Sequence, residues 1–167
     1  MSSFDSTRGP ELTAALMNIT TQIRAMQAQQ LSITSEMDNL NIGTAAGHPS
    51  LSSFLSEALR ITRRKASRMI AHAEATTPVL TPTGHLTPPP LPATREALVE
   101  GALDEEHVDL IIATLKKLPD SVSVADREQA EATLATAARS MDANTLRPVP
   151  LGGARSGRSG TRPREVG

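Results

Sequence analysis

Residues 11–40 carry a regular apolar spacing that restricts this part of the chain to one long helix. The apolar positions follow one another at intervals of four and three residues, interrupted once by Gln30. They are Leu12, Leu16, Ile19, Ile23, Met26, Ile33, Met37 and Leu40. A helix of this length spans roughly 45 Å. The spacing is that of a coiled-coil seam with one polar position.

Two interpretations of this stripe are open. The helix covers the core of its own domain, which is the interpretation we favour, or it pairs with a helix of another chain. The positions beside the seam are Thr, Ala and Gln, and Glu36 is the only charged residue among them. Ion pairs across the seam would therefore not select a partner. A homodimer through residues 11–40 is the alternative expectation.

The composition favours helices over the whole length of the chain. Its 167 residues include two Phe and neither Trp nor Tyr, so Leu, Ile, Met, Val and Ala must fill the core. Aliphatic and Ala-rich material packs helix on helix more readily than in a β-sandwich. The length suits one domain with tails. We therefore predict an all-α, multi-helix fold.

Gly- and Pro-containing segments divide the rest of the chain. Ser50, Thr62 and Asp104 are candidate N-caps of helices. We predict a helical domain over residues 11–146, between a disordered N-terminus (1–10) and a disordered tail (147–167). Within the domain we expect the long helix (11–40), a helix-turn-helix-like unit (50–76), a Pro-rich strap (77–93), a second such unit (94–118) and a helix (124–141).

The strap is the least regular of these segments. Six prolines between residues 76 and 94 rule out a regular helix there. Val79, Leu80, Leu86 and Leu91 are interleaved with them. We expect a segment that lies on the surface of the domain and buries a few of these side chains.

Two stretches of the chain match each other at an offset of 42 residues. Residues 61–71 align with residues 103–113 in their apolar positions and in the candidate N-cap. The charges invert between the two copies. Residues 57–75 hold five basic and two acidic side chains, whereas residues 96–118 hold two basic and six acidic ones. Only the first copy could approach phosphates.

The basic residues of the first copy are the candidate functional site. They are Arg60, Arg63, Arg64, Lys65 and Arg68. On a helix over 63–76 the buried stripe would be Ala66, Met69, Ile70 and Ala73, and the cations fall away from it. Because the acidic copy keeps the stripe without the cations, the fold does not need them. We expect phosphate contacts with DNA and no reading of bases.

The basic residues outside this copy do not make the whole surface cationic. From Arg147 to the end there are five Arg and one Glu, a net +4. The preceding 146 residues hold 12 basic and 17 acidic residues, a net −5. The mildly acidic folded part argues against nucleic-acid binding by its whole surface.

Motifs for catalysis and metal binding do not occur in the sequence. The chain has no Cys, and no two of its four His are spaced as metal ligands on a helix. We expect no enzyme activity, cofactor or small-molecule ligand, and we expect His72 and His107 at surface or boundary positions. The N-terminus has no apolar leader and no run of eighteen apolar residues occurs. This predicts a cytoplasmic protein that does not enter a membrane.

Four features in order carry a resemblance to a known family. They are the A-x-R helix of "SFLSEALRITRRKASRMIAHAEA", the L-P-A-T-x-x-A-L-x-x-G block at Leu91–Gly101, the following His107, and the K-x-L-P stop at Leu118–Pro119. From about Leu51 to Leu146 the chain resembles the helical N-terminal domain called domain of unknown function 222. That domain is found in actinobacteria, in the mycobacterial thirteen-E-twelve repeat family.

The resemblance implies an accessory domain associated with an HNH endonuclease. In the family this domain usually precedes a C-terminal HNH module that carries the catalytic and metal-binding residues. Residues 147–167 do not match that module, so no catalytic residue is carried over. Their Arg, Gly, Ser and Pro composition suggests a truncated or frameshifted member of the family. One alternative is a protein-interaction or self-association module, in which the basic copy of the repeat faces the acidic copy of another chain or of the same chain. The other is a gene remnant without a function.

Overall fold

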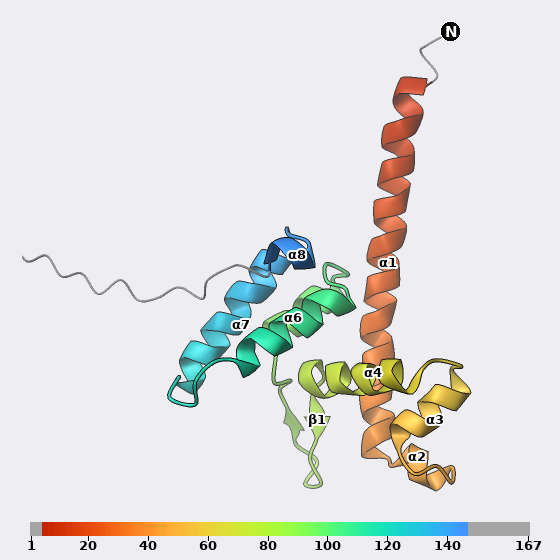
Figure 1. The fold of residues 1–167 in the computed structure, drawn as a ribbon, viewed down its shortest axis with the longest axis vertical. Helices are drawn as coiled ribbons and strands as arrows, with labels where there is room; N and C mark the ends of the chain where they lie inside the picture. The colour runs from red at the N-terminus through yellow and green to blue at the C-terminus, as the bar shows by residue number, and fades with distance from the viewer. Residues whose placement is uncertain (1–4, 147–167) are drawn as a thin grey trace, which may run out of the picture.

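Eight helices and one two-stranded hairpin make up residues 5–146, the part of the chain that the computed structural model describes (Figure 1). The all-α prediction is confirmed, with the hairpin as a small addition. The helices are α1 (Asp5–Asn39), α2 (Ile42–Ala45), α3 (Leu51–Ala58), α4 (Arg63–Thr76), α5 (Pro92–Val99), α6 (Glu105–Lys116), α7 (Val124–Ala138) and α8 (Ala143–Leu146). The strands are β1 (Val79–Leu80) and β2 (Leu86–Thr87). Residues 1–4 and the predicted tail lie outside the described residues.

The long helix begins earlier than predicted. α1 starts at Asp5 and contains Pro10, so the predicted disorder is wrong for residues 5–10. Pro10 lies close to the start of the helix and removes only one backbone hydrogen bond there. The hydroxyl of Thr13 donates to the carbonyl of Gly9 at 3.0 Å.

One side of α1 packs against the rest of the protein, and it is the less apolar side. α4 and α5 lie against it. Ala28, Leu31 and Thr34 are buried there. The Arg24 guanidinium donates to the carbonyl of Ala102 at 3.3 Å and to the Asp104 carboxylate at 3.1 Å. Small and polar residues therefore join α1 to the other helices.

The apolar stripe lies on the opposite side of α1, so the favoured interpretation of it is wrong. We call its eight positions the α1 stripe. Seven of them are between 51% and 67% exposed, and only Met37 packs in part against the core. The seven are Leu12, Leu16, Ile19, Ile23, Met26, Ile33 and Leu40. The N-terminal half of α1 extends beyond the other helices (Figure 1), and every residue from 7 to 19 is exposed.

The two predicted units appear as two pairs of helices. In the first, α3 and α4 are capped by Ser50 and Thr62, whose hydroxyls accept from the backbone N–H groups of Ser53 and Lys65. In the second, α5 is followed by α6, which Asp104 caps. The charges of the two units differ, but the same local rule starts α4 and α6.

The L-P-A-T block places α5 between α1 and α7. Pro92 occupies the first turn of α5, where a missing N–H costs nothing. The buried carboxylate of Glu131 on α7 accepts from the backbone N–H and the hydroxyl of Thr94, both at 2.6 Å. At the other end of α5, Gly101 has a left-handed φ of 74° and lies against the backbone of Thr21. The block is therefore explained by packing.

The Pro-rich strap folds as a hairpin and buries only some of its apolar side chains. β1 and β2 are antiparallel and pair Leu80 with Leu86. These two leucines are 62% and 66% exposed. They lie opposite each other across the hairpin instead of packing on the domain. Val79 and Leu91 are half-buried.

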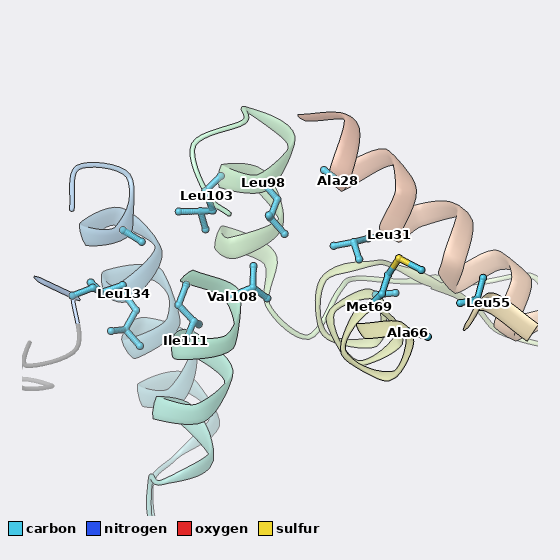
Figure 2. Packing of buried hydrophobic residues seen from close by; sticks show 14 of the residues in the cluster. Ala28, Leu31, Leu55, Ala66, Met69, Leu98, Leu103, Val108, Ile111 and Leu134 are labelled. Atoms are coloured by element: carbon cyan, nitrogen blue, oxygen red, sulfur yellow. The ribbon is translucent and has the colours of Figure 1, made fainter. Parts of the chain in front are cut away.

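The hydrophobic core is one cluster with two parts, each formed by a different group of helices. Figure 2 shows Leu98, Leu103, Val108, Ile111 and Leu134 packed together between α5, α6 and α7. The second half of the core is formed by α1, α3 and α4, and Figure 2 shows its members. They are Ala28, Leu31, Leu55, Ala66 and Met69.

No helix within residues 5–146 has both the length and the apolar character needed to cross a membrane.

Candidate nucleic-acid interface

The first cation of the candidate site lies in the tight turn between α3 and α4. Arg60 has a left-handed φ of 54°, a conformation that usually selects Gly or Asn. The turn closes with the backbone N–H of Ile61 donating to the carbonyl of Ser56 at 3.1 Å, and the Ser56 hydroxyl donates to the carbonyl of Ile61 at 2.7 Å. The Arg60 side chain is exposed.

The next three cations form the first turn of α4. Arg63, Arg64 and Lys65 follow the cap residue Thr62 and are all exposed. Arg63 donates to the hydroxyl of Ser53 at 3.0 Å, which ties α4 to α3 without neutralising the charge. Within residues 5–146, no carboxylate forms an ion pair with Arg60 or with these three. We call these four residues the basic cluster.

The basic cluster opposes the electrostatics of its own helix. The N-terminus of a helix carries a partial positive charge and unpaired N–H groups, and it favours acidic side chains. The equivalent helix α6 follows this rule, with Glu105 and Glu106 in its first turn. Three cations in the first turn of α4 raise the positive potential there. Helix stability therefore does not account for them.

Arg68 does not belong to the basic cluster. Its guanidinium pairs with Asp109 of α6 at 2.7 Å and with Glu105 at 3.4 Å, and its side chain is one-third exposed. Arg68 falls away from the buried stripe of α4, as predicted, but it faces the carboxylates of α6. The acidic copy of the repeat lies against the basic copy within the same chain and takes up this charge.

His72 and His107 are buried, not at the surface or boundary as expected. His72 is 2% exposed, and its Nε2 lies 2.6 Å from the Asp109 carboxylate, because α6 covers that side of α4. His107 is 4% exposed, and its Nε2 donates to the carbonyl of Met141 at 2.8 Å. His72 therefore joins α4 to α6, and His107 joins α6 to the segment between α7 and α8.

His107 also completes the start of α6. The Asp104 carboxylate accepts from the backbone N–H of Glu106 and of His107, and lies 2.8 Å from the His107 Nδ1. Burial acts to raise the pKa of Asp104, but the hydrogen bonds and charge of His107 and the charge of Arg24 outweigh it. The pKa of Asp104 therefore lies below its ordinary value.

Sequence reasoning found the cations of this region and raised pairing between the basic and the acidic copy, but it did not assign a partner to any single cation. Ser53, Glu105 and Asp109 decide which cations are held and which are exposed. The inversion of charge between the two copies was the available signal, since opposite charges at matching positions can pair within one chain. Among the described residues, no group of three His, Asp or Glu is placed to hold a metal ion.

The fold and the surface define a class of protein: an all-α domain in which two pairs of helices, α3–α4 and α5–α6, are joined to a long helix through α4 and α5. The chain belongs to the family described as Domain of unknown function (DUF222), which it matches over residues 13–149. This match confirms the family resemblance that the sequence predicted.

The chain is similar to proteins of mycobacteria. It is 34% identical over 136 residues to the uncharacterized proteins Rv1945 of Mycobacterium tuberculosis and Mb1179c of Mycobacterium bovis, which covers 81% of this chain. It is 31% identical over 133 residues to the uncharacterized protein Rv1128c of M. tuberculosis. The chain spans about 30% of the length of these relatives. No solved structure matches it.

Proposed function

We propose that this chain is a non-catalytic accessory domain that holds nucleic acid by its phosphates through the basic cluster. The observation that carries the proposal is the set of four exposed cations at the start of α4 that no described carboxylate neutralises. Cations placed against the helix dipole do not stabilise the helix, and of the four only Arg63 makes a side-chain hydrogen bond within the described residues. We infer that a bound anion is the reason to keep them. Four phosphate contacts without base contacts give binding independent of sequence.

We further propose that this domain serves a nuclease module of a longer protein. About 70% of the length of each relative lies outside the matched segment and could hold the HNH module that the family resemblance implies. The basic cluster would then bring DNA to a catalytic module that the described residues do not contain. Binding without base reading suits this role, because the domain would not restrict the choice of target.

Salt dependence of DNA binding tests the basic cluster. We expect the basic cluster by itself to account for about a hundredfold loss of affinity for a short duplex between roughly 50 and 200 mM salt, since four phosphates contribute about −3.6 to the log–log slope. The double charge reversal Arg64→Glu/Lys65→Glu should make that slope shallower by about two. Fluorescence anisotropy of a labelled duplex measures both.

A matched control separates the cluster from general charge. Lys116→Glu/Lys117→Glu makes the same change of charge at exposed residues on the far end of α6, and its salt slope should stay near that of the unchanged chain. The five arginines after residue 146 are present in all three proteins, so they do not affect the comparison. Equal slopes for the two double variants would show that the basic cluster is not the binding site.

A further inference from the structure

The α1 stripe and a groove beside it form one continuous apolar surface. A groove of about 360 Å³ lies between α1 and α3. Met26, Ile33 and Met37 of the stripe line it on one side, and Phe54 of α3 and Leu59, which follows α3, line it on the other. The C-terminal half of the stripe therefore has α3 beside it, whereas no helix lies beside the N-terminal half, from Leu12 to Ile23.

We propose that a second copy of this chain covers this surface, with the two α1 helices antiparallel. In this arrangement the N-terminal half of each α1 lies in the α1–α3 groove of the other copy. Each copy supplies both the unsupported helix and the groove that receives it. The contact is two-fold symmetric and closes at two copies.

The register follows from the spacing of the stripe. In an antiparallel coiled coil the two alternating seam positions face each other. A two-fold axis between residues 24 and 25 achieves this along nearly the whole stripe. It places Leu12 opposite Met37, Leu16 opposite Ile33, Ile19 opposite Gln30, and Ile23 opposite Met26. Gln30 then meets an apolar partner twice, and Leu40 alone lies beyond the paired region.

The area of the surface approaches what a stable dimer requires. The six exposed stripe residues that pair in this register, from Leu12 to Ile33, are each more than half exposed. They present on the order of 600 Å² of accessible surface per copy, and the groove of the other copy adds to it, toward the roughly 800 Å² per partner of a standard interface. A helix whose residues 7–19 are all exposed is also marginal by itself in water. A partner helix provides the burial that this segment lacks.

The residues beside the stripe favour a protein partner over a lipid surface. Helices that lie on membranes carry many Lys and Arg on their polar side. The polar side of α1 carries Arg8 and Arg24, and Arg24 pairs with Asp104. The seam is flanked instead by small or neutral residues such as Ala15, Thr20 and Gln22, which lose little on burial and allow two helices to approach.

The mass of the full chain at tens of micromolar tests the second copy. We expect a dimer by sedimentation velocity, and we expect Ile19→Glu/Ile23→Glu to raise its dissociation constant by about a hundredfold or more, because two charges would be buried in the seam. The control Ala14→Glu/Asn18→Glu adds the same charges with the same spacing on the outer side of α1, and it should remain dimeric. A monomeric full chain, or a dimer that tolerates Ile19→Glu/Ile23→Glu, would overturn the proposal.

Disulfide trapping tests the orientation without adding charge to the seam. The chain has no cysteine, so Leu16→Cys and Ile33→Cys each introduce a single thiol at an exposed stripe position. An equimolar mixture should oxidise mainly to the mixed disulfide, since residues 16 and 33 face each other only in the antiparallel register. Efficient homodisulfides of Leu16→Cys by itself would show a parallel pair and overturn the antiparallel arrangement.

Discussion

At the scale of single residues, Gly101 shows how tightly the second unit is fixed to α1. Its φ of 74° suits glycine, and a Cβ there would overlap the carbonyl oxygen of Thr21. Gly101→Ala should therefore lower the free energy of unfolding by about 2–4 kcal/mol, because backbone strain and overpacking act together. Urea unfolding followed by circular dichroism measures this loss.

Gly47 provides the comparison for Gly101. Its φ is 82°, yet a Cβ there would meet nothing within 4 Å. Gly47→Ala should cost only the strain of the left-handed conformation, about 1 kcal/mol. The difference between the two variants isolates the contact with α1. Equal losses would mean that α1 does not lie against the turn at Gly101.

At the scale of elements, the start of α6 depends on the charge of Asp104. The pKa of Asp104 lies below its ordinary value in the folded protein. The ionised carboxylate therefore stabilises the fold above about pH 4, the ordinary pKa of Asp, and this stabilisation is lost as the pH falls through the lower, folded pKa. Asp104→Asn keeps a capping side chain but removes the charge. It should cost about 1 kcal/mol at neutral pH, where the contacts of Asp104 with Arg24 and His107 depend on its charge.

The pH dependence of that loss is the decisive measurement. The difference between Asp104→Asn and the unchanged chain should shrink toward zero as the pH falls from 5 to about 2, because the native carboxyl then becomes neutral as well. Asp120→Asn, which changes an exposed carboxylate, should stay within about 0.5 kcal/mol of the unchanged chain at neutral pH. A loss at Asp104 that is the same at every pH would assign the effect to shape instead of charge.

Features of the helices that depend on neighbours close in the sequence could be predicted, whereas the orientation of α1 could not. Caps at Ser50, Thr62 and Asp104 depend on neighbours within one or two turns, so local pattern predicted them. Of the predicted buried stripe of α4, Ala66, Met69 and Ala73 are buried, whereas Ile70 is half-buried. The side of α1 that faces the core could not be found in this way. Periodicity locates an apolar stripe but does not say what covers it.

Polar contacts between residues far apart in the sequence could not be predicted from local sequence patterns either. His72 meets Asp109 from 37 residues away, and Arg24 meets Asp104 from 80 residues away. These contacts turn residues that look like surface positions into links between helices. Arg68 does not belong to the basic cluster for the same reason, because its partner Asp109 lies far away in the sequence. The other four cations are exposed, because no element covers the start of α4.

At the scale of the whole molecule, stability is unevenly distributed. The helices from α3 to α7 share one buried core, whereas residues 7–19 of α1 bury no side chain within a single copy. Local opening of a helix costs little where it makes few tertiary contacts. Backbone amides in this segment should therefore exchange with deuterium quickly in a dilute sample, while amides of α6 and α7 should be protected.

The same segment should become protected as the protein concentration rises. If two copies pair through α1, protection of residues 12–23 follows the dimer population, because binding stabilises only the paired state. Hydrogen exchange read by mass spectrometry at sub-micromolar and at high micromolar concentration should show this change in α1 and little change in α6. The Ile19→Glu/Ile23→Glu variant should exchange quickly at both concentrations, and Ala14→Glu/Asn18→Glu should follow the unchanged chain. Protection of residues 12–23 that is high and independent of concentration would mean that contacts within one copy hold this half of α1, and the need for a second copy would disappear.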